Sequence, residues 1–188
     1  PRCALCAHAP ARHMAVDGCV KLASYANCGT RTLRPPHAEM TRLVVPADAV
    51  EMAYQAWHGL ANPRASESQS LCDHRFTAAR QREGRAGLAS EGVMSIVCRH
   101  GAPWRLLDMV RAECPSQALV LHLLAANEEP PLTFLGYDLA CRYAAGLTEA
   151  RCQAVWDVLE ARGLVSSRCR TKALQLVLGG CKVVLAAM

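Results

Sequence analysis

The 188-residue chain is poor in lysine and in charge, and it has no long apolar run. Its longest uncharged stretch, Cys114–Asn127, contains a proline, a glutamine and a histidine. This stretch is shorter than the about 20 apolar residues that a membrane-spanning helix needs, so no membrane span is predicted. The chain starts at Pro1 without a basic segment that leads into an apolar signal core, and we expect its natural N-terminus to lie upstream.

Charged residues make up 20% of the chain against 52% hydrophobic residues. This balance argues against disorder and predicts one folded domain over residues 1–188. Of the 21 basic residues 18 are arginines, and the formal net charge is +5. The charge is compatible with a polyanionic partner such as nucleic acid, although abundant arginine is also typical of a GC-rich genome.

Cysteine, by contrast, is abundant, with eleven residues. The number is odd, and several cysteines lie in apolar or helical patterns, where a free cysteine behaves as a small hydrophobe. Examples are Cys141, Cys152 and Cys181. We therefore expect a reduced intracellular protein with a metal site rather than a secreted disulfide scaffold.

Hydrophobic periodicity predicts strands and helices in alternation. Strands are expected near residues 14–16, 20–25, 93–98, 132–138 and 182–188. Helices are expected at residues 47–60, at 104–126 with a break at Pro115, and at 148–162. The first two strands form a hairpin that turns at Asp17-Gly18, and residues 27–92 form an insertion between early strands. This order predicts an α/β domain with a mixed sheet.

Two aspartates each end a predicted strand, Asp17 and Asp138. In an α/β sheet both can project from the same edge. Two carboxylates there can hold divalent cations such as Mg²⁺, which prefer oxygen ligands and stabilise the attacking and leaving oxygens of phosphoryl chemistry. The alternative is structural, with Asp17 in an ordinary Asp-Gly turn and Asp138 as the cap of the next helix.

Cysteine and histidine pairs predict a zinc site, which needs four ligands in tetrahedral array. The preferred set is Cys3, Cys6, Cys98 and His100, with Cys72 and His74 as the alternate second pair. Four protein ligands leave no open position for water, so a zinc ion there is structural. The alternative is that these cysteines are core or terminal residues and the histidine is a surface residue.

Contacts with nucleic acid are predicted for four arginines that lie within eleven residues. They are Arg75, Arg80, Arg82 and Arg85. The alternative is a solvated helix face. The tryptophans Trp57, Trp104 and Trp156 have apolar neighbours at helical spacing, and we interpret them as core packing rather than base stacking.

Four motifs resemble, in order and spacing, the Kyakuja, Dileera and Zisupton (KDZ) transposases. They are His-Met-Ala-Val-Asp17-Gly-Cys-Val-Lys-Leu, Cys72 with Phe76-Thr-Ala, Cys98-Arg-His100-Gly, and Tyr137-Asp138-Leu-Ala-Cys141. The last motif is the most specific, and the resemblance covers nearly the whole chain. It implies an RNase H-like fold, which also has the order of the predicted elements.

The resemblance implies that Asp17 and Asp138 are the first two catalytic acids of a transposase that uses Mg²⁺ or Mn²⁺ to cut and join duplex DNA at transposon ends. It further implies a nuclear location and allows a homo-oligomer. The family's third acid is a glutamate on a later helix. Residues 161–188 contain no carboxylate, so we expect the chain to end before the last catalytic helix. Cys19, in place of asparagine, and Arg111-Ala-Glu113-Cys, in place of Gly-Glu-Arg, depart from the family pattern.

Two other functions stay open at this point. The first is a non-catalytic, zinc-stabilised DNA-binding or interaction module derived from a transposon. The DNA affinity of such a module decreases steeply as the salt concentration rises, and it does not depend on the two aspartates. The second is a different RNase H-like nuclease that acts on RNA:DNA hybrids or junctions.

Overall fold

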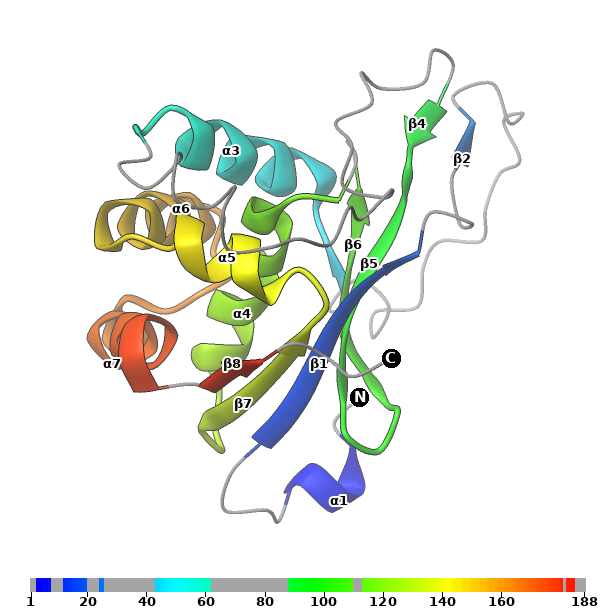
Figure 1. Ribbon diagram of the computed structural model, residues 1–188, viewed down its shortest axis with the longest axis vertical. Helices are drawn as coiled ribbons and strands as arrows, with labels where there is room; N and C mark the ends of the chain where they lie inside the picture. Colours follow the sequence, from blue (N-terminus) through cyan, green and yellow to red (C-terminus); the bar gives the residue numbers. More distant parts are fainter. Residues whose placement is uncertain are drawn as a thin grey trace.

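A mixed six-stranded sheet with helices packed on it forms the centre of the molecule (Figure 1). The computed structural model describes residues 3–7, 12–19, 24–25, 43–61, 88–109, 113–180 and 182–184. The strand order is β3-β6-β5-β1-β7-β8. These strands are β1 (Arg12–Cys19), β3 (Val44–Val45), β5 (Gly92–Cys98), β6 (Pro103–Met109), β7 (Leu132–Tyr137) and β8 (Lys182–Val184).

The strand directions divide the sheet into two halves. On one side, β5 pairs antiparallel with both β1 and β6, and the short β3 adds to β6 in parallel. On the other side, β1, β7 and β8 are parallel. A separate antiparallel pair, β2 (Ser24–Tyr25) with β4 (Leu88–Ser90), extends from the upper end of the sheet in Figure 1. The mixed α/β class predicted from the sequence is therefore confirmed.

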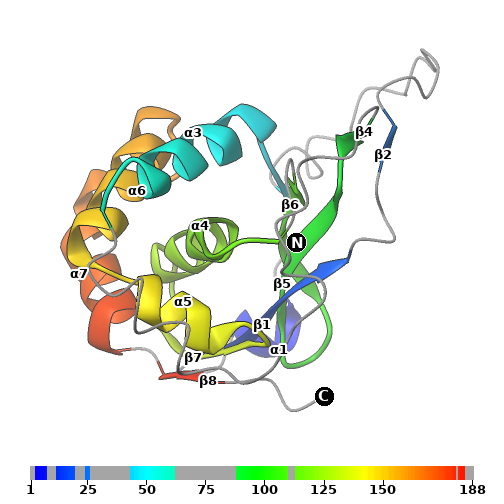
Figure 2. The same ribbon diagram turned by 45° about the horizontal axis from the view of Figure 1, so that its top comes forward.

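The helices gather on one side of the sheet, as Figure 2 shows. They are α3 (Ala47–His58), α4 (Pro115–Ala126), α5 (Ala140–Gly146), α6 (Glu149–Ala161) and α7 (Arg170–Gln175). The short α1 (Ala4–Ala7) is apart from these helices, at the lower end of the sheet in Figure 1. Helix α4 lies between the sheet and the outer helices, because it contacts β5, β6 and β7 as well as α3, α6 and α7. Within the described residues, no helix is long and apolar enough to cross a membrane.

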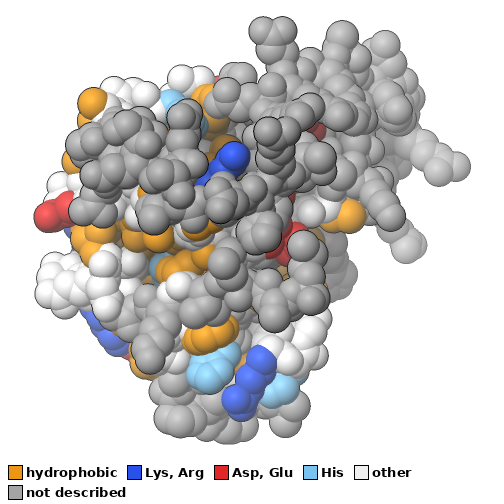
Figure 3. All heavy atoms as spheres, viewed as in Figure 1, with side chains coloured by type: hydrophobic (Ala, Val, Ile, Leu, Met, Phe, Trp, Pro, Cys, Tyr) orange, Lys and Arg blue, Asp and Glu red, His pale blue; other side chains and the backbone are white. Residues whose placement is uncertain are grey.

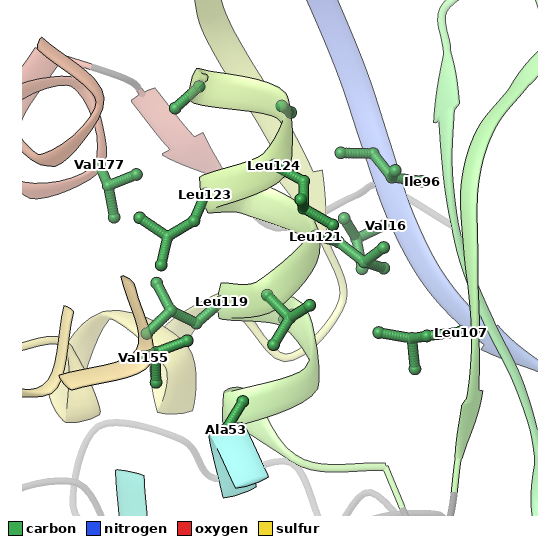
Figure 4. Close-up of a cluster of buried hydrophobic side chains, with 14 of the residues drawn as sticks. Val16, Ala53, Ile96, Leu107, Leu119, Leu121, Leu123, Leu124, Val155 and Val177 are labelled. Atoms are coloured by element: carbon green, nitrogen blue, oxygen red, sulfur yellow. The ribbon is translucent and has the colours of Figure 1, made fainter. Parts of the chain in front are cut away.

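Burial on all sides explains the composition of α4. Every residue of this helix except Pro115 is buried. Figure 4 shows Leu121 directed toward Val16 of the sheet and Leu119 directed toward Val155 of α6. A helix that is apolar all round is typical of a position inside a core.

The strands present alternate residues to this helix. In β1 the side chains of Arg12, Met14 and Val16 are buried, and in β5 every second residue from Gly92 to Cys98 is buried. This period of two is expected when one face of a sheet is covered. The residues between them, and Asp17 after Val16, are less buried.

Several predicted elements are confirmed. They are the helices at residues 47–60 and 148–162 and the strands at 93–98 and 132–138, which correspond to α3, α6, β5 and β7. Thr148 is the N-cap of α6, where its side chain accepts a hydrogen bond from the Arg151 amide at 3.3 Å. Gly163 follows the helix with φ +67°, a conformation that favours glycine and ends the helix. The last predicted strand is β8, and α5 is an additional helix between β7 and α6.

The predicted hairpin turn at Asp17-Gly18 is wrong. Strand β1 continues through both residues to Cys19, with Asp17 opposite Ser95 and Gly18 opposite Met94 in β5. The aspartate therefore lies within the strand. Asp-Gly is a common turn dipeptide, but here the ladder with β5 determines the conformation.

The helix predicted for residues 104–126 is wrong in its first half, which is β6. The turn before it brings the chain back alongside β5, with Gly101 at φ +78° and a backbone hydrogen bond from Cys98 to the Ala102 carbonyl at 3.0 Å. Apolar residues at positions 104, 106, 107 and 110 imitate a helical period, and pairing with β5 overrides it. The second half is confirmed as α4.

All three tryptophans are buried, with exposed fractions of 3% for Trp57, 7% for Trp104 and 0% for Trp156, which confirms core packing. Two of them are also covered by arginines. The guanidinium of Arg12 lies 4.6 Å from the ring centre of Trp104, and that of Arg151 lies 4.8 Å from the ring of Trp57. Buried cations over aromatic faces are attracted by the ring quadrupole.

The predicted insertion, residues 27–92, stays a prediction in its boundaries. The described parts of it are β3, which joins the edge of the sheet, α3, which packs on α6, and β4. Its Cys72 and His74 lie outside the described residues.

Candidate active site and Cys/His cluster

The two predicted acids, Asp17 and Asp138, come together on neighbouring parallel strands. Val16 of β1 pairs with Tyr137 of β7, and each aspartate is the next residue in its chain. The side chain of Asp17 is exposed, and that of Asp138 is partly buried. Burial raises the pKa of Asp138, and the charge of Asp17 raises it further, which reflects their proximity.

A third carboxylate, Glu113, lies at the same edge of the sheet. It precedes α4 and is 8% exposed. Burial raises its pKa to about 7, the charge of Asp138 is the next cause, and Asp17 adds a smaller repulsion. Its Oε1 atom is buried and has no hydrogen-bond partner. In the sequence, Glu113 stands out only as part of Arg111-Ala-Glu113-Cys, which departs from the family motif.

Gly18 allows Glu113 to approach the strand. A Cβ atom at position 18 would lie 2.7 Å from Glu113 Oε2, 3.0 Å from Glu113 Cδ and 3.2 Å from Met109 Sδ. These separations are shorter than ordinary van der Waals contact, so any side chain here must displace the carboxylate. The glycine after Asp17 therefore serves a close approach and not a turn.

The start of α4 fixes the position of Glu113. Cys114 is the N-cap, Pro115 is at the first helical position, and the Gln117 side chain accepts a hydrogen bond from the Cys114 amide at 3.1 Å. This reciprocal cap and the proline define the first turn sharply. Glu113 thus lies just before a helix N-terminus, where the helix dipole favours a negative charge.

Tyr137 closes the inner side of this acidic group. Its side chain is fully buried and packs edge-on against Tyr143, with ring centres 6.0 Å apart. Burial raises the pKa of its phenol, and the Glu113 charge raises it further, so Tyr137 stays protonated. The phenol in turn lowers the pKa of Glu113, although no hydrogen bond of good geometry forms to the Tyr137 hydroxyl.

The four preferred zinc ligands also come together, at the lower end of the sheet in Figure 1. Their ligand atoms all lie within 4.8 Å of one another. The Nδ1 atom of His100 lies 3.5 Å from Cys3 Sγ, 3.4 Å from Cys6 Sγ and 3.9 Å from Cys98 Sγ. A sulfur at 2.3 Å and a nitrogen at 2.0–2.1 Å from a tetrahedral zinc ion are about 3.6 Å apart. The cluster therefore has the dimensions of a Cys₃His site.

Two elements supply this cluster. Cys3 and Cys6 bracket the first turn of α1, where the Cys6 amide donates to the Cys3 carbonyl at 3.0 Å. Cys98 ends β5 and is 4% exposed, and His100 lies in the turn that follows. Burial raises the pKa of the Cys6 thiol to about 11, and the neighbouring Cys98 and Cys3 raise it as well. Without a cation, Cys98 and Cys3 therefore disfavour ionisation of the Cys6 thiol.

The described cysteines carry no disulfide. This holds for all eight described cysteines, the three in the cluster included. Cys152 is completely buried in the core, as expected for a cysteine that acts as a small hydrophobe.

The remaining predicted site residues lie outside the described residues. They are the alternate zinc ligands Cys72 and His74 and the arginines Arg75, Arg80, Arg82 and Arg85. Their roles stay predictions. On the face shown in Figure 3, acidic side-chain atoms are visible near the middle of the sheet, and histidine and basic side chains lie next to each other at its lower end.

Comparison with known proteins gives one match. The family model described as Kyakuja-Dileera-Zisupton transposase matches residues 10–168, a range that includes Asp17, Glu113 and Asp138. No curated protein and no solved structure matches the chain.

Proposed function

The chain belongs to the Kyakuja-Dileera-Zisupton transposase family, and we propose that it carries the catalytic core of an RNase H-like enzyme that cuts and joins DNA. The acids of this core are Asp17 and Asp138, and its substrate is duplex DNA at transposon ends. Water and then a 3′-hydroxyl group serve as the nucleophiles.

The strand order supports the RNase H-like assignment. Three antiparallel strands, β6, β5 and β1, continue into the parallel strands β7 and β8, with β1 in the centre. Helix α4 connects the antiparallel half to β7, and α5 to α7 connect β7 to β8. This order supports an RNase H-like sheet to which β3 is added at one edge.

The observation that carries the proposal is the adjacency of Asp17 and Asp138 in the β1–β7 register. Their carboxylate oxygens suit Mg²⁺ or Mn²⁺, which prefer hard oxygen ligands. When bound, such ions stabilise the attacking and leaving oxygens of an in-line displacement at phosphorus. The contribution of the protein is to hold the two carboxylates on a rigid sheet edge, because sites built on strands keep their geometry better than sites on loops.

The Cys/His cluster supports a structural role for zinc in the same core. Three thiolates and one imidazole would complete the coordination of a zinc ion and would leave no position for water or substrate. A zinc ion held by these residues would tie α1 to the turn between β5 and β6. This position is at the opposite end of β1 from Asp17, so we assign the zinc to folding and not to chemistry.

The second candidate function is a non-catalytic, zinc-stabilised DNA-binding module, and the closed geometry of the cluster favours it. The two candidates differ in their need for the acids. Cleavage requires Asp17 and Asp138, whereas binding through basic residues depends on salt and not on these carboxylates.

The test is Mn²⁺-dependent nicking of supercoiled plasmid by the wild-type protein and by Asp17→Asn and Asp138→Asn. We expect each variant to lose at least about 100-fold in rate, because an amide replaces an anionic ligand. Asp157→Asn, on the exposed face of α6, is the matched control and keeps its activity, since its ion pair with Arg170 is exposed.

Nicking by both aspartate variants at the wild-type rate removes these residues from the mechanism. If the wild-type protein binds duplex DNA with a steep salt dependence but does not nick it, and both variants bind equally well, the second candidate is favoured.

A further inference from the structure

We propose that Glu113 is a further ligand of the divalent-cation site formed by Asp17 and Asp138, so that the described part of the chain carries a three-carboxylate centre. This inference rests on the proposed function, because it assigns a ligand to the same site. It adds a residue from the connection between β6 and α4 to the two strand residues.

The first observation is a buried carboxylate with one oxygen, Oε1, that accepts no hydrogen bond. Glu113 is 92% buried, its Oε1 atom accepts no hydrogen bond, and no lysine or arginine among the described residues forms an ion pair with it. Burying an unpaired carboxylate is strongly unfavourable unless a cation or hydrogen bonds compensate. A bound cation supplies this compensation.

The second observation is the direction of the side chain. Its Oε2 atom is directed at Gly18, the residue after Asp17. Because Val16 of β1 pairs with Tyr137 of β7, Asp138 follows the neighbouring strand at the same level. Glu113 thus lies against the strand end that carries Asp17, next to the strand that leads to Asp138.

The third observation is an unpartnered oxygen on the neighbouring acid. Asp138 Oδ1 is also buried and accepts no hydrogen bond. Two unpartnered carboxylate oxygens therefore lie at one edge of the sheet, together with the exposed carboxylate of Asp17. Like charges in such a group repel one another, and a divalent cation reverses this effect.

A purely structural role for Glu113 is the competing explanation. In that case its charge interacts with the N-terminus of α4, and its carboxyl group is held near the Tyr137 hydroxyl. A structural role predicts that Glu113→Gln lowers stability and leaves cation binding unchanged. A ligand role predicts the reverse, because removal of an unpaired buried charge does not weaken the metal-free fold.

The experiment is calorimetric titration of Mn²⁺ into the zinc-loaded protein, with thermal unfolding measured with and without Mn²⁺. We expect Glu113→Gln to weaken Mn²⁺ binding at least tenfold, to reduce the Mn²⁺-induced rise in Tm, and to leave the Tm without Mn²⁺ unchanged or higher. Glu149→Gln, on the exposed first turn of α6, is the control and binds Mn²⁺ like the wild type. Asp17→Asn and Asp138→Asn are titrated in parallel.

The outcomes separate the two proposals. Wild-type Mn²⁺ affinity in Glu113→Gln, with lost binding in Asp17→Asn, overturns the role of Glu113 and leaves the proposed function intact. Mn²⁺ binding that is absent in the wild type, or unchanged in both aspartate variants, overturns both. If Glu113→Gln does not fold, the same titration is made with Glu113→Asp, which keeps the negative charge on a shorter side chain. We expect Glu113→Asp to bind Mn²⁺ at least threefold more weakly than the wild type. An Mn²⁺ affinity of Glu113→Asp equal to that of the wild type contradicts the proposal.

Discussion

The carboxylate of Glu113 lies so close to Gly18 that a single methyl group at position 18 would come within 2.7 Å of its Oε2 atom. The two residues are far apart in the chain, and they meet because the end of β1 lies beside the residue that precedes α4. Asp17 and Gly18 therefore have separate roles. Asp17 presents an exposed carboxylate, and Gly18 leaves room for the carboxylate of Glu113.

We predict that Gly18→Ala destabilises the protein by about 1–3 kcal/mol, because the added methyl group displaces Glu113 and presses on Met109. The same variant should weaken Mn²⁺ binding. Gly179→Ala is the control, since a Cβ atom at that position meets nothing within 4 Å, and its stability should equal or exceed that of the wild type. Urea unfolding and Mn²⁺ calorimetry measure both effects. Equal stability of Gly18→Ala and the wild type would show that the Glu113 and Met109 side chains move aside without a loss of stability.

Zinc content gives a second prediction. The wild-type protein should carry one zinc ion per chain, and Cys3→Ser, Cys6→Ser and His100→Ala should each lose it, because each removes one of four ligands. Cys169→Ser is the control, since this thiol lies outside the cluster. Elemental analysis of purified protein measures the metal. In Co²⁺-substituted protein, the absorption of a tetrahedral Cys₃His site should appear in the wild type and in the control alone. Full zinc content in the ligand variants would rule out this site.

The sequence predicted which aspartates and which cysteine and histidine residues lie together, because their signals are local. Asp138 follows an unbroken apolar strand, and Cys98-x-His100 follows another, so each motif defines its own place at the end of a strand. The pairing of Asp17 with Asp138 required only that their two strands be neighbours. Parallel register then brings the two carboxylates to the same level of the sheet.

Glu113 could not be found in this way, because no local pattern distinguishes it. Its signal is a contact with Gly18, which depends on strand order and on the exact start of α4. In retrospect, a glutamate directly before Cys114-Pro115, where a helix begins, was the available clue. The secondary structure of residues 103–109 was predicted wrongly for a related reason. Its apolar spacing fits a helix, and only the pairing with β5 makes it a strand.

A third prediction concerns Arg12, which holds the end of α4 against the sheet. Its buried guanidinium donates hydrogen bonds to the carbonyl oxygens of Pro130 at 2.5 Å, Ala125 at 2.5 Å and Glu128 at 2.8 Å. Arg12→Lys replaces this planar fork by one ammonium group, which cannot reach all three acceptors. We expect a loss of about 2–4 kcal/mol in the free energy of unfolding, measured with urea.

Arg162→Lys is the matched control for Arg12→Lys. The Arg162 side chain is 40% exposed and pairs with Asp48 at 2.5 Å on the surface. An exposed pair contributes at most about 1 kcal/mol, so this variant should unfold close to the wild-type urea midpoint. A loss in Arg12→Lys no larger than in the control would mean that the buried carbonyl groups find other donors.

The last prediction is a dependence of stability on pH that arises from His122 in the middle of α4. This histidine is fully buried, its Nδ1 atom lies 2.7 Å from the Tyr143 hydroxyl, and burial lowers its pKa to about 3. In the unfolded chain its pKa is about 6.5, so below that pH the unfolded state binds a proton that the folded state does not. Stability therefore falls as the pH decreases, by about 2 kcal/mol between pH 7 and pH 5 from this residue alone.

The change in unfolding free energy between these two pH values should be about 2 kcal/mol smaller in His122→Gln than in the wild type. This comparison cancels the contributions of the exposed histidines and of acid release of zinc, which both proteins share. If the two proteins lose the same stability between pH 7 and pH 5, the imidazole must accept a proton inside the folded core, and its burial would not impose the neutral form.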